Sequence, residues 1–301
     1  MLGVQREASV GSDLGQSPAT AVGLKGFPRS SAAAAALVLA LAAPSTAGPP
    51  FLTDDPEPVE LQHWEAYLFT TYDAAREATG IQGPAAEVNY GAAPGLQLHL
   101  VVPYTTAEPA GGGSAQGLGD FEVGVKYRFV EEGEHRPQIG IFPMVELPTG
   151  NERRGLGNGR LWARLPLWLQ KSWGPWTTYG GGGYAMNGAD GARDYVFGGW
   201  LVQRDLGKRL TLGAEVYLRG ADSVGGRGTS ILNGGGVIAL AHGLSVLLSA
   251  GHSVTGERHG IAYVGLYWTG GGTAGPDAPG RVGATCVGPD KRVASLAGGG
   301  M

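Results

Sequence analysis

Hydrophobic and polar residues alternate along much of the chain from residue 62 onward. In residues 121–129, Phe, Val, Val, Tyr and Phe take one set of alternate positions, and Glu, Gly, Lys and Arg take the other. Residues 96–102 and 210–219 repeat this pattern. Because successive side chains of a β-strand point to opposite faces, each stretch predicts a strand with one apolar and one polar face. A wall with lipid outside and a lumen inside needs such strands.

The same pattern predicts about a dozen strands in antiparallel order. Their predicted ranges are 62–73, 83–91, 96–105, 119–130, 137–148, 160–171, 175–187, 193–204, 209–219, 229–240, 244–254 and 260–268. Tight links are predicted at 92–95, 131–136, 172–174, 205–208 and 241–243. The intervening loops, mostly longer and polar or Gly-rich, are predicted at 74–82, 106–118, 149–159, 188–192, 220–228 and 255–259.

This alternation of connections is typical of outer-membrane barrels, in which short turns face the periplasm and long loops face the exterior. Both chain termini would then be periplasmic. A soluble β-sandwich is the competing fold, but it would expose hydrophobic strand faces less evenly. The predicted fold class is therefore all-β, a transmembrane antiparallel up-and-down β-barrel of about 12 strands.

Composition agrees with this class and excludes others. The chain has 301 residues, of which 55 are Gly and 16% are charged, and its mean hydropathy is -0.04. The region after residue 47 contains no run of about 20 apolar residues, so a bundle of transmembrane helices is disfavoured. A net charge of -4 gives no support to a nucleic-acid partner.

The N-terminus resembles an export signal. Lys25 and Arg29 precede an apolar run at 32–43, and small residues at 45–47 suggest cleavage before Gly48. A buried Ala-rich helix is the alternative, which the basic flank and Pro44 disfavour. The predicted regions are a leader and signal peptide at 1–47, a periplasmic N-terminal segment at 48–61, an outer-membrane barrel at 62–268 and a disordered Gly/Pro/Ala-rich tail at 269–301, which holds the lone Cys286.

The sequence contains no recognisable set of catalytic residues. The six His residues are scattered, with no nucleophile at a telling spacing, so we do not expect an enzyme. Asp54, Asp55 and Glu57 resemble an acidic cation site, but the prolines between and after them favour a stiff, solvated segment. We expect neither a metal nor a cofactor.

Charged residues at inward-facing positions are candidates for lining a pore. Strand register places Glu122 level with Glu146, and the 149–159 loop brings Glu146 close to Arg160 and Arg164. Such neighbours predict an interleaved acid and base cluster at the external mouth. The alternative is a solvated lumen face on which each pair contributes at most about 1 kcal/mol. The predicted pore-lining residues are Glu122, Lys126, Arg128, Glu146, Arg160, Trp162, Arg164, Trp168, Glu215 and Arg219.

Aromatic residues fall into two groups. Alternation places Trp162 and Trp168 on the face of Arg164 and Gln170, so they point into the lumen, where they could stack on a planar solute or simply fill space. Others lie near strand ends, where a membrane-interface girdle is expected. They are Trp64, Tyr72, Tyr90, Tyr104, Trp173, Trp176, Tyr267 and Trp268.

Several segments resemble a known family. They are PPFLTDDPEPVELQHWE at 49–65, GDFEVGVKYRF at 119–129, PQIGIFPMVELPTGN at 137–151, RGLGNGR at 154–160 and PLWLQKSWGPWTTYGGGGY at 166–184. This sequence is similar to the outer-membrane proteins grouped as the meta-pathway of phenol degradation family, over residues 49–268. The resemblance implies an outer-membrane β-barrel described as a transporter or channel. One departure is the tail that follows the expected terminal aromatic, Tyr267 or Trp268.

These observations predict a channel or transporter in the outer membrane of a Gram-negative bacterium. Small solutes, with aromatic or hydrophobic ones as candidates, would cross it by passive diffusion. About 12 strands lie between filled eight-strand barrels and open 16-strand porins, so the conduit would be narrow. Expected partners are outer-membrane lipid, the barrel-assembly machinery and a small-molecule solute. The alternative is a closed structural or adhesive barrel that acts through its external loops.

Overall fold

The computed structural model describes residues 49–271, apart from 76–77, 110–112, 242 and 257. These residues form β-strands and one short 3-10 helix, η1 (Glu152–Arg154). The predicted signal peptide and nearly all of the predicted tail, including Cys286, lie outside the described residues. Among the helices that are described, none has the length and apolar character to cross a membrane.

The strands follow one another around a single sheet. The first half of the wall contains β1 (His63–Ala75), β2 (Ala78–Ala93), β3 (Leu96–Pro109), β4 (Ala115–Leu118), β5 (Phe121–Val130), β6 (Gln138–Ile141) and β7 (Met144–Leu147). The second half contains β8 (Trp162–Trp173), β9 (Trp176–Asn187), β10 (Tyr195–Asp205), β11 (Leu210–Arg219), β12 (Thr229–Ala241), β13 (Leu244–Thr255) and β14 (His259–Gly271).

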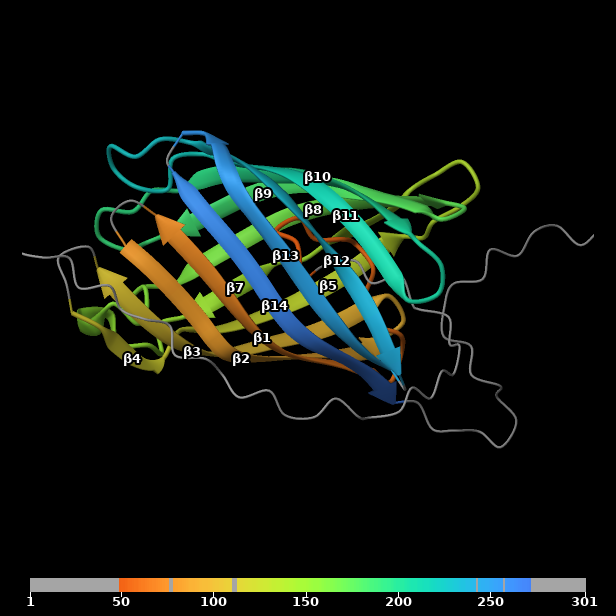
Figure 1. The fold of residues 1–301 in the computed structure, drawn as a ribbon, viewed down its shortest axis with the longest axis horizontal. Helices are drawn as coiled ribbons and strands as arrows, with labels where there is room; N and C mark the ends of the chain where they lie inside the picture. Colours follow the sequence, from red (N-terminus) through yellow and green to blue (C-terminus); the bar gives the residue numbers. More distant parts are fainter. Residues whose placement is uncertain (1–48, 76–77, 110–112, 242, 257, 272–301) are drawn as a thin grey trace, which may run out of the picture. The chain divides into compact units, whose positions relative to one another are not determined.

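The sheet closes into a barrel because β1 pairs with both β2 and β14 (Figure 1). β4 and β5 both pair with β3, so they are two parts of one interrupted strand of the barrel. β6 and β7 both pair with β5 and β8, so they are two parts of another. When each of these pairs counts as one strand, the 14 strands of the described sheet make a closed antiparallel barrel of 12 strands. The predicted fold class is confirmed.

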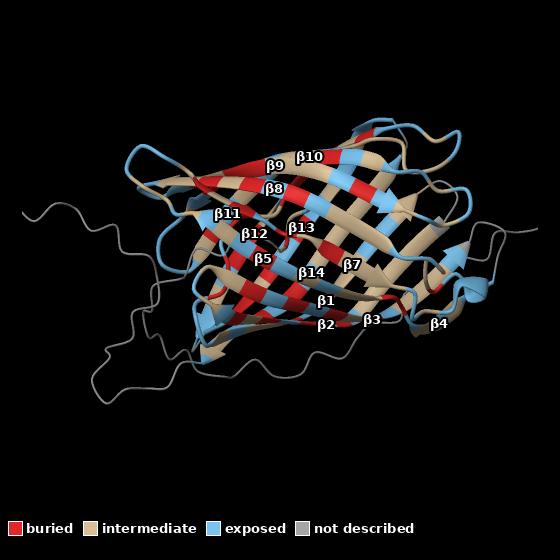
Figure 2. Cartoon of the chain, turned by 180° about the vertical axis from the view of Figure 1, so that it is seen from behind, coloured by how far each residue is buried: buried red, intermediate tan, exposed pale blue. Residues whose placement is uncertain are grey.

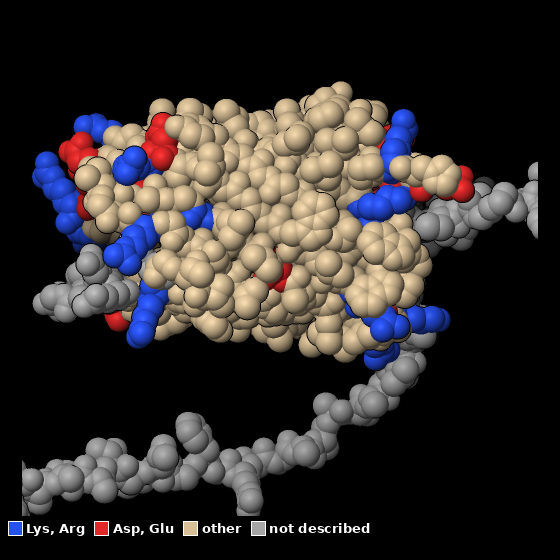
Figure 3. Space-filling model, turned by 90° about the horizontal axis from the view of Figure 1, so that it is seen from above, with Lys and Arg blue, Asp and Glu red and all other residues tan. Residues whose placement is uncertain are grey.

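Burial alternates along the strands as the sequence pattern predicts (Figure 2). On β5, the outward residues Val123 and Val125 are each 38% exposed, whereas the inward residue Lys126 is 5% exposed. On the face that Figure 3 shows, charged residues lie at the two ends, with a broad, nearly charge-free band between them. Such a band matches the hydrocarbon layer, so the barrel is a transmembrane one.

Two of the predicted loops are largely strand. Within 74–82, β1 and β2 stay paired as far as Ala74 and Thr79, so only 76–77 lie between the two strands. Within 106–118, β3 continues to Pro109 and β4 occupies four more residues. The small and polar side chains there lack an apolar alternation, yet their backbone groups still pair with the neighbouring strand. The long loops 149–159 and 220–228 are not replaced by strands in this way.

The aromatic girdle is largely as predicted, with one error. Trp64, Trp173 and Trp268 are 44%, 52% and 45% exposed on the outside. Tyr267 is instead 2% exposed and points inward, where its hydroxyl donates to Glu65 at 2.7 Å. Adjacent strand residues face opposite sides, so Trp268 takes the outward position and Tyr267 cannot.

Candidate functional site in the barrel lumen

The N-terminal segment, residues 49–61, lies inside the barrel (Figure 1). Thr53 is fully buried and Asp55 is 1% exposed. The interpretation of this region as a solvated segment is therefore wrong. Its polar groups find partners on the lumen wall, and these partners replace the water that the sequence pattern suggested.

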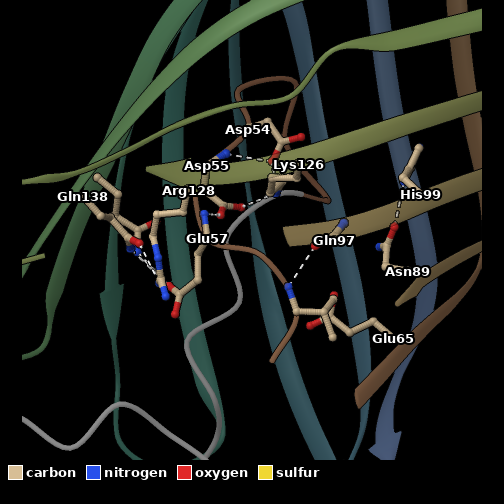
Figure 4. Close-up of polar contacts among 12 residues, drawn as sticks. Asp54, Asp55, Glu57, Glu65, Asn89, Gln97, His99, Lys126, Arg128 and Gln138 are labelled. Carbon is tan, nitrogen blue, oxygen red and sulfur yellow. Dashed lines mark hydrogen bonds and ion pairs between the residues drawn. The ribbon is translucent and has the colours of Figure 1, made fainter. Parts of the chain in front are cut away.

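Lys126 binds the acidic part of the N-terminal segment (Figure 4). Its ammonium group lies 3.0 Å from a carboxylate oxygen of Asp54 and 3.4 Å from one of Asp55. Burial raises the pKa of the Asp55 carboxyl, and the Lys126 charge opposes that shift. Lys126 thus supplies the positive charge that a bound cation would otherwise bring to these carboxylates.

Glu215 on β11 holds the backbone of the N-terminal segment. Its two carboxylate oxygens accept hydrogen bonds from the backbone N–H groups of Leu52 and Thr53, at 2.8 and 2.7 Å. The side chain of Asn233 donates a third hydrogen bond at 2.7 Å. Hydrogen bonds from backbone N–H groups to a buried carboxylate are among the stronger ones, so this contact fixes the segment at mid-strand depth.

Amide side chains hold the segment nearer to the short turns of the barrel. The carboxylate of Glu57 accepts from Gln138 at 3.3 Å and from Gln170 at 3.1 Å. The backbone N–H of Val59 donates to Gln97 at 2.9 Å. Each of these glutamines is buried and lies near the strand end that adjoins a short turn. The N-terminal segment thus fills the half of the lumen on the short-turn side.

A polar network crosses the wall of the lumen over β2, β3, β5 and β8. Asn89 donates to Glu87 at 2.8 Å and contacts a ring nitrogen of His99 at 2.7 Å. The other ring nitrogen lies 3.1 Å from Glu122, which also forms an ion pair with Arg164. Glu87 and Glu122 therefore each have a hydrogen-bond or ion-pair partner in this network.

A vestibule of about 500 Å³ lies at the opposite end of the lumen, among the long loops. Residues of β7, β8, β9, β10 and β11 line it with residues from the long loops; they include Glu146, Trp162, Asn187, Tyr195, Arg219 and Asp222. The guanidinium group of Arg164 lies 4.8 Å from the Trp162 ring. The Trp162 indole N–H has no hydrogen-bond acceptor among the described residues.

Aromatic side chains continue inward from the vestibule. A buried cluster of Phe142, Met144, Trp168, Ala185 and Phe197 packs against Trp162, Tyr195 and Tyr217. Ring centroids of Trp168 and Phe197 are 6.3 Å apart, and those of Tyr195 and Phe197 are 6.4 Å apart. The long-loop half of the lumen therefore has an aromatic wall.

The structure brings most of the predicted acid and base cluster together. Glu122 is the register partner of Glu146, and it pairs with Arg164. Glu146 is the register partner of Trp162 and lines the vestibule. Arg160 is exposed in the loop before β8 and lies outside the strand that carries Arg164.

The other predicted residues have varied surroundings. Lys126 and Glu215 hold the N-terminal segment, and Arg128 donates to Gln138 at 3.1 Å. Trp168 is 2% exposed within the aromatic cluster. Arg219 lines the vestibule and lies 3.2 Å from Asp222. All of them are on the inward faces of their strands.

Sequence reasoning missed the lumen contacts of the N-terminal segment and several inward aromatics. Tyr195 and Phe197 alternate with the outward Val196 on β10, so strand alternation could have identified them. His99 was on a recognised polar face, but its place between Asn89 and Glu122 depends on the register of three strands. Local sequence patterns do not show how these strands are aligned with one another.

The fold and the lumen define the class of protein as a transmembrane β-barrel of the outer-membrane type. A family model described as "Putative MetA-pathway of phenol degradation" matches residues 69–268. The chain belongs to this family. The resemblance recognised from the sequence segments is thereby confirmed.

One solved structure shares the fold at low sequence identity, and two others are more distant. An outer-membrane channel from Pseudomonas putida F1 is 14% identical, with a TM-score of 0.56, over 71% of this chain and 98% of that chain. The KdgM porin, solved with oligogalacturonate, is 10% identical with a TM-score of 0.46, over 67% and 98% of the two chains. The CymD monoaromatic hydrocarbon channel is 10% identical with a TM-score of 0.40, over 71% and 89%. A search of curated proteins finds no match.

Proposed function

We propose that this protein is an outer-membrane channel through which small solutes diffuse passively. The observation that carries the proposal is the lining of the lumen. Charged, amide and aromatic side chains face inward while the lipid-facing positions are apolar. A barrel that served only as a scaffold would not need an aromatic wall that opens into a vestibule. The matched family and the fold of the Pseudomonas putida channel support the same function.

Planar solutes are the class that the long-loop half of the lumen fits best. Trp162 and Tyr195 border the vestibule with their rings, and Arg219 adds a hydrogen-bond donor beside them. Glu146 and Asn187 add acceptors in the same vestibule. A small aromatic molecule with one polar substituent would satisfy both kinds of contact.

The second candidate function is a closed barrel that acts through its loops. The presence of the N-terminal segment in the lumen favours it, because that segment fills the short-turn half. The two functions differ in whether any solute crosses the folded protein.

Liposome swelling tests the proposal. The chain from residue 48 to 301, reconstituted into liposomes, should speed swelling in solutions of small sugars and amino acids, and phenylalanine should enter faster than leucine. Only protein that migrates differently on a gel before and after boiling, and is therefore folded, is used in the assay. Swelling rates equal to those of protein-free liposomes for every solute, both with and without the N-terminal segment, would establish the closed barrel instead.

A further inference from the structure

The lumen wall is shaped to receive the N-terminal segment. A Cβ atom on Gly91 would overlap the backbone carbonyl of Glu60, and one on Gly199 would overlap the side chain of Thr53. Two further inward glycines approach the segment in the same way. Gly213 would place a Cβ 3.0 Å from Phe51, and Gly140 would place one 3.1 Å from Pro56. Glycines of β2, β6, β10 and β11 thus form a seat that side chains would close.

Polar contacts hold the segment in this seat. Backbone and carboxylate groups of the segment bond to Lys126, Glu215 and the buried glutamines, and the carbonyl of Pro50 accepts from Ser249 at 2.6 Å. Neither described apolar cluster includes a residue of the segment, although its Val59 and Pro56 are buried. Within the described residues, an isolated bridge between Leu61 and Gly91 joins the end of the segment to the sheet. The segment could therefore leave without unpairing two strands, because water can replace hydrogen bonds and ion pairs.

The segment lies in the path that a solute would take through the lumen. Its contacts run from the glutamines near the short turns to Glu215 and Ser249 at mid-strand. A solute that moved from the vestibule to the short-turn end would meet the segment. Removal of the segment would widen this half of the lumen.

We propose that residues 50–60 are a resident plug in a peptide-binding seat, and that the channel reaches its full conductance only when the plug leaves. The inference rests on the proposed channel function. The seat takes an extended, proline-containing peptide with three carboxylates that match Lys126 and the amide side chains. An empty seat should accept such a peptide from solution.

A disulfide lock tests the departure. Thr53→Cys together with Gly199→Cys joins plug and wall, because a Cβ on Gly199 would lie 3.2 Å from that of Thr53, a few tenths of an ångström short of the usual spacing in disulfides. The double variant is made with Cys286→Ser, and Thr53→Cys alone and Gly199→Cys alone are the controls, the second because a side chain at Gly199 could itself displace the plug. In planar bilayers, oxidation should reduce the large current steps at least tenfold, and reduction should restore them. Oxidised channels with unchanged large steps would overturn the plug.

A second variant covers poor folding of the cysteine pair. Glu215→Gln in the full chain weakens the bonds to Leu52 and Thr53 and should make large steps at least threefold more frequent. A chain without residues 50–60 should conduct at the large level throughout, and the synthetic peptide PFLTDDPEPVE should block it. A peptide with Asn at the positions of Asp54 and Asp55 and Gln at the position of Glu57 is the control and should not block.

The outcomes separate the two proposals. Folded protein that passes no current even without residues 50–60 would refute the channel function. Current that flows in every variant, with no effect of the lock, the deletion or the peptide, would refute the plug and leave the channel function in place.

Discussion

The two halves of the lumen are built from different chemistry. The short-turn half holds the N-terminal segment through ion pairs and hydrogen bonds at Lys126 and Glu215. The long-loop half presents aromatic rings and a vestibule around Trp162 and Tyr195. Polar contacts can exchange with water, whereas a packed aromatic wall stays in place. The difference suggests that one half controls passage and the other selects what enters.

The labelling of single cysteines gives the largest expected effect on this comparison, since it decides which half faces outward. Asn151→Cys lies in an exposed long loop, and Glu134→Cys lies in a short turn. An impermeant thiol reagent on intact cells should label the first and leave the second unlabelled. Labelling of Glu134→Cys alone would place the plugged half at the exterior.

A change at the seat should have the next largest effect. Gly91→Ala puts a Cβ against the backbone of Glu60, so we expect the N-terminal segment to leave the lumen and become open to chymotrypsin, which can cleave after Phe51. The temperature at which the folded gel band disappears should fall. Gly234→Ala is the matched control, because its nearest neighbour would be 3.9 Å away. Equal protease resistance in the two variants would mean that the seat tolerates a side chain.

Removal of one partner of the Glu122 and Arg164 pair should alter ion selectivity. Arg164→Ala leaves a largely buried carboxylate with His99 as its remaining partner, which costs about 3–5 kcal/mol of stability. The uncompensated negative charge should raise the cation-to-anion permeability ratio severalfold, and Glu122→Gln should lower it. Reversal potentials in a salt gradient measure the ratio.

Arg160→Ala serves as the control for this pair, because Arg160 is an exposed residue before β8. Its reversal potential should stay near that of the parent. If Arg160→Ala and Arg164→Ala shifted the potential equally, the ion pair inside the lumen would have no special role in selectivity.

The smallest expected effect concerns the aromatic wall. Trp162→Ala should reduce the preference for phenylalanine over leucine about twofold in liposome swelling, because one stacking face is lost. Trp200→Ala is the matched control, since Trp200 is 53% exposed on the outer surface. A parent-like preference in Trp162→Ala would assign this tryptophan to packing alone.

Local patterns predicted the wall of the barrel but not its contents. Alternation fixes which side of a strand faces lipid, so β5 and β11 could be identified residue by residue. The same rule placed Trp168 and Arg164 in the lumen. It failed at Tyr267, where proximity to the chain end suggested a girdle although the alternating neighbours of Tyr267 point outward.

The N-terminal segment could not be placed from the sequence, because its partners are remote. Asp55 meets Lys126 and Thr53 meets Glu215 only after the barrel has closed. A stretch of acidic residues and prolines is equally compatible with solvent and with a polar lumen, so its composition does not distinguish the two locations. Glycines such as Gly91 and Gly199 carried a signal, but without the fold they could not be separated from glycines that serve turns or bends.

The current through single molecules of the purified chain in a planar bilayer tests the central claim most directly. The account predicts discrete steps, smaller than those of 16-strand porins, with rarer large steps when residues 50–60 leave the lumen. Protein that is folded by its gel mobility but passes no current, with or without residues 50–60, would contradict the channel and leave a closed barrel.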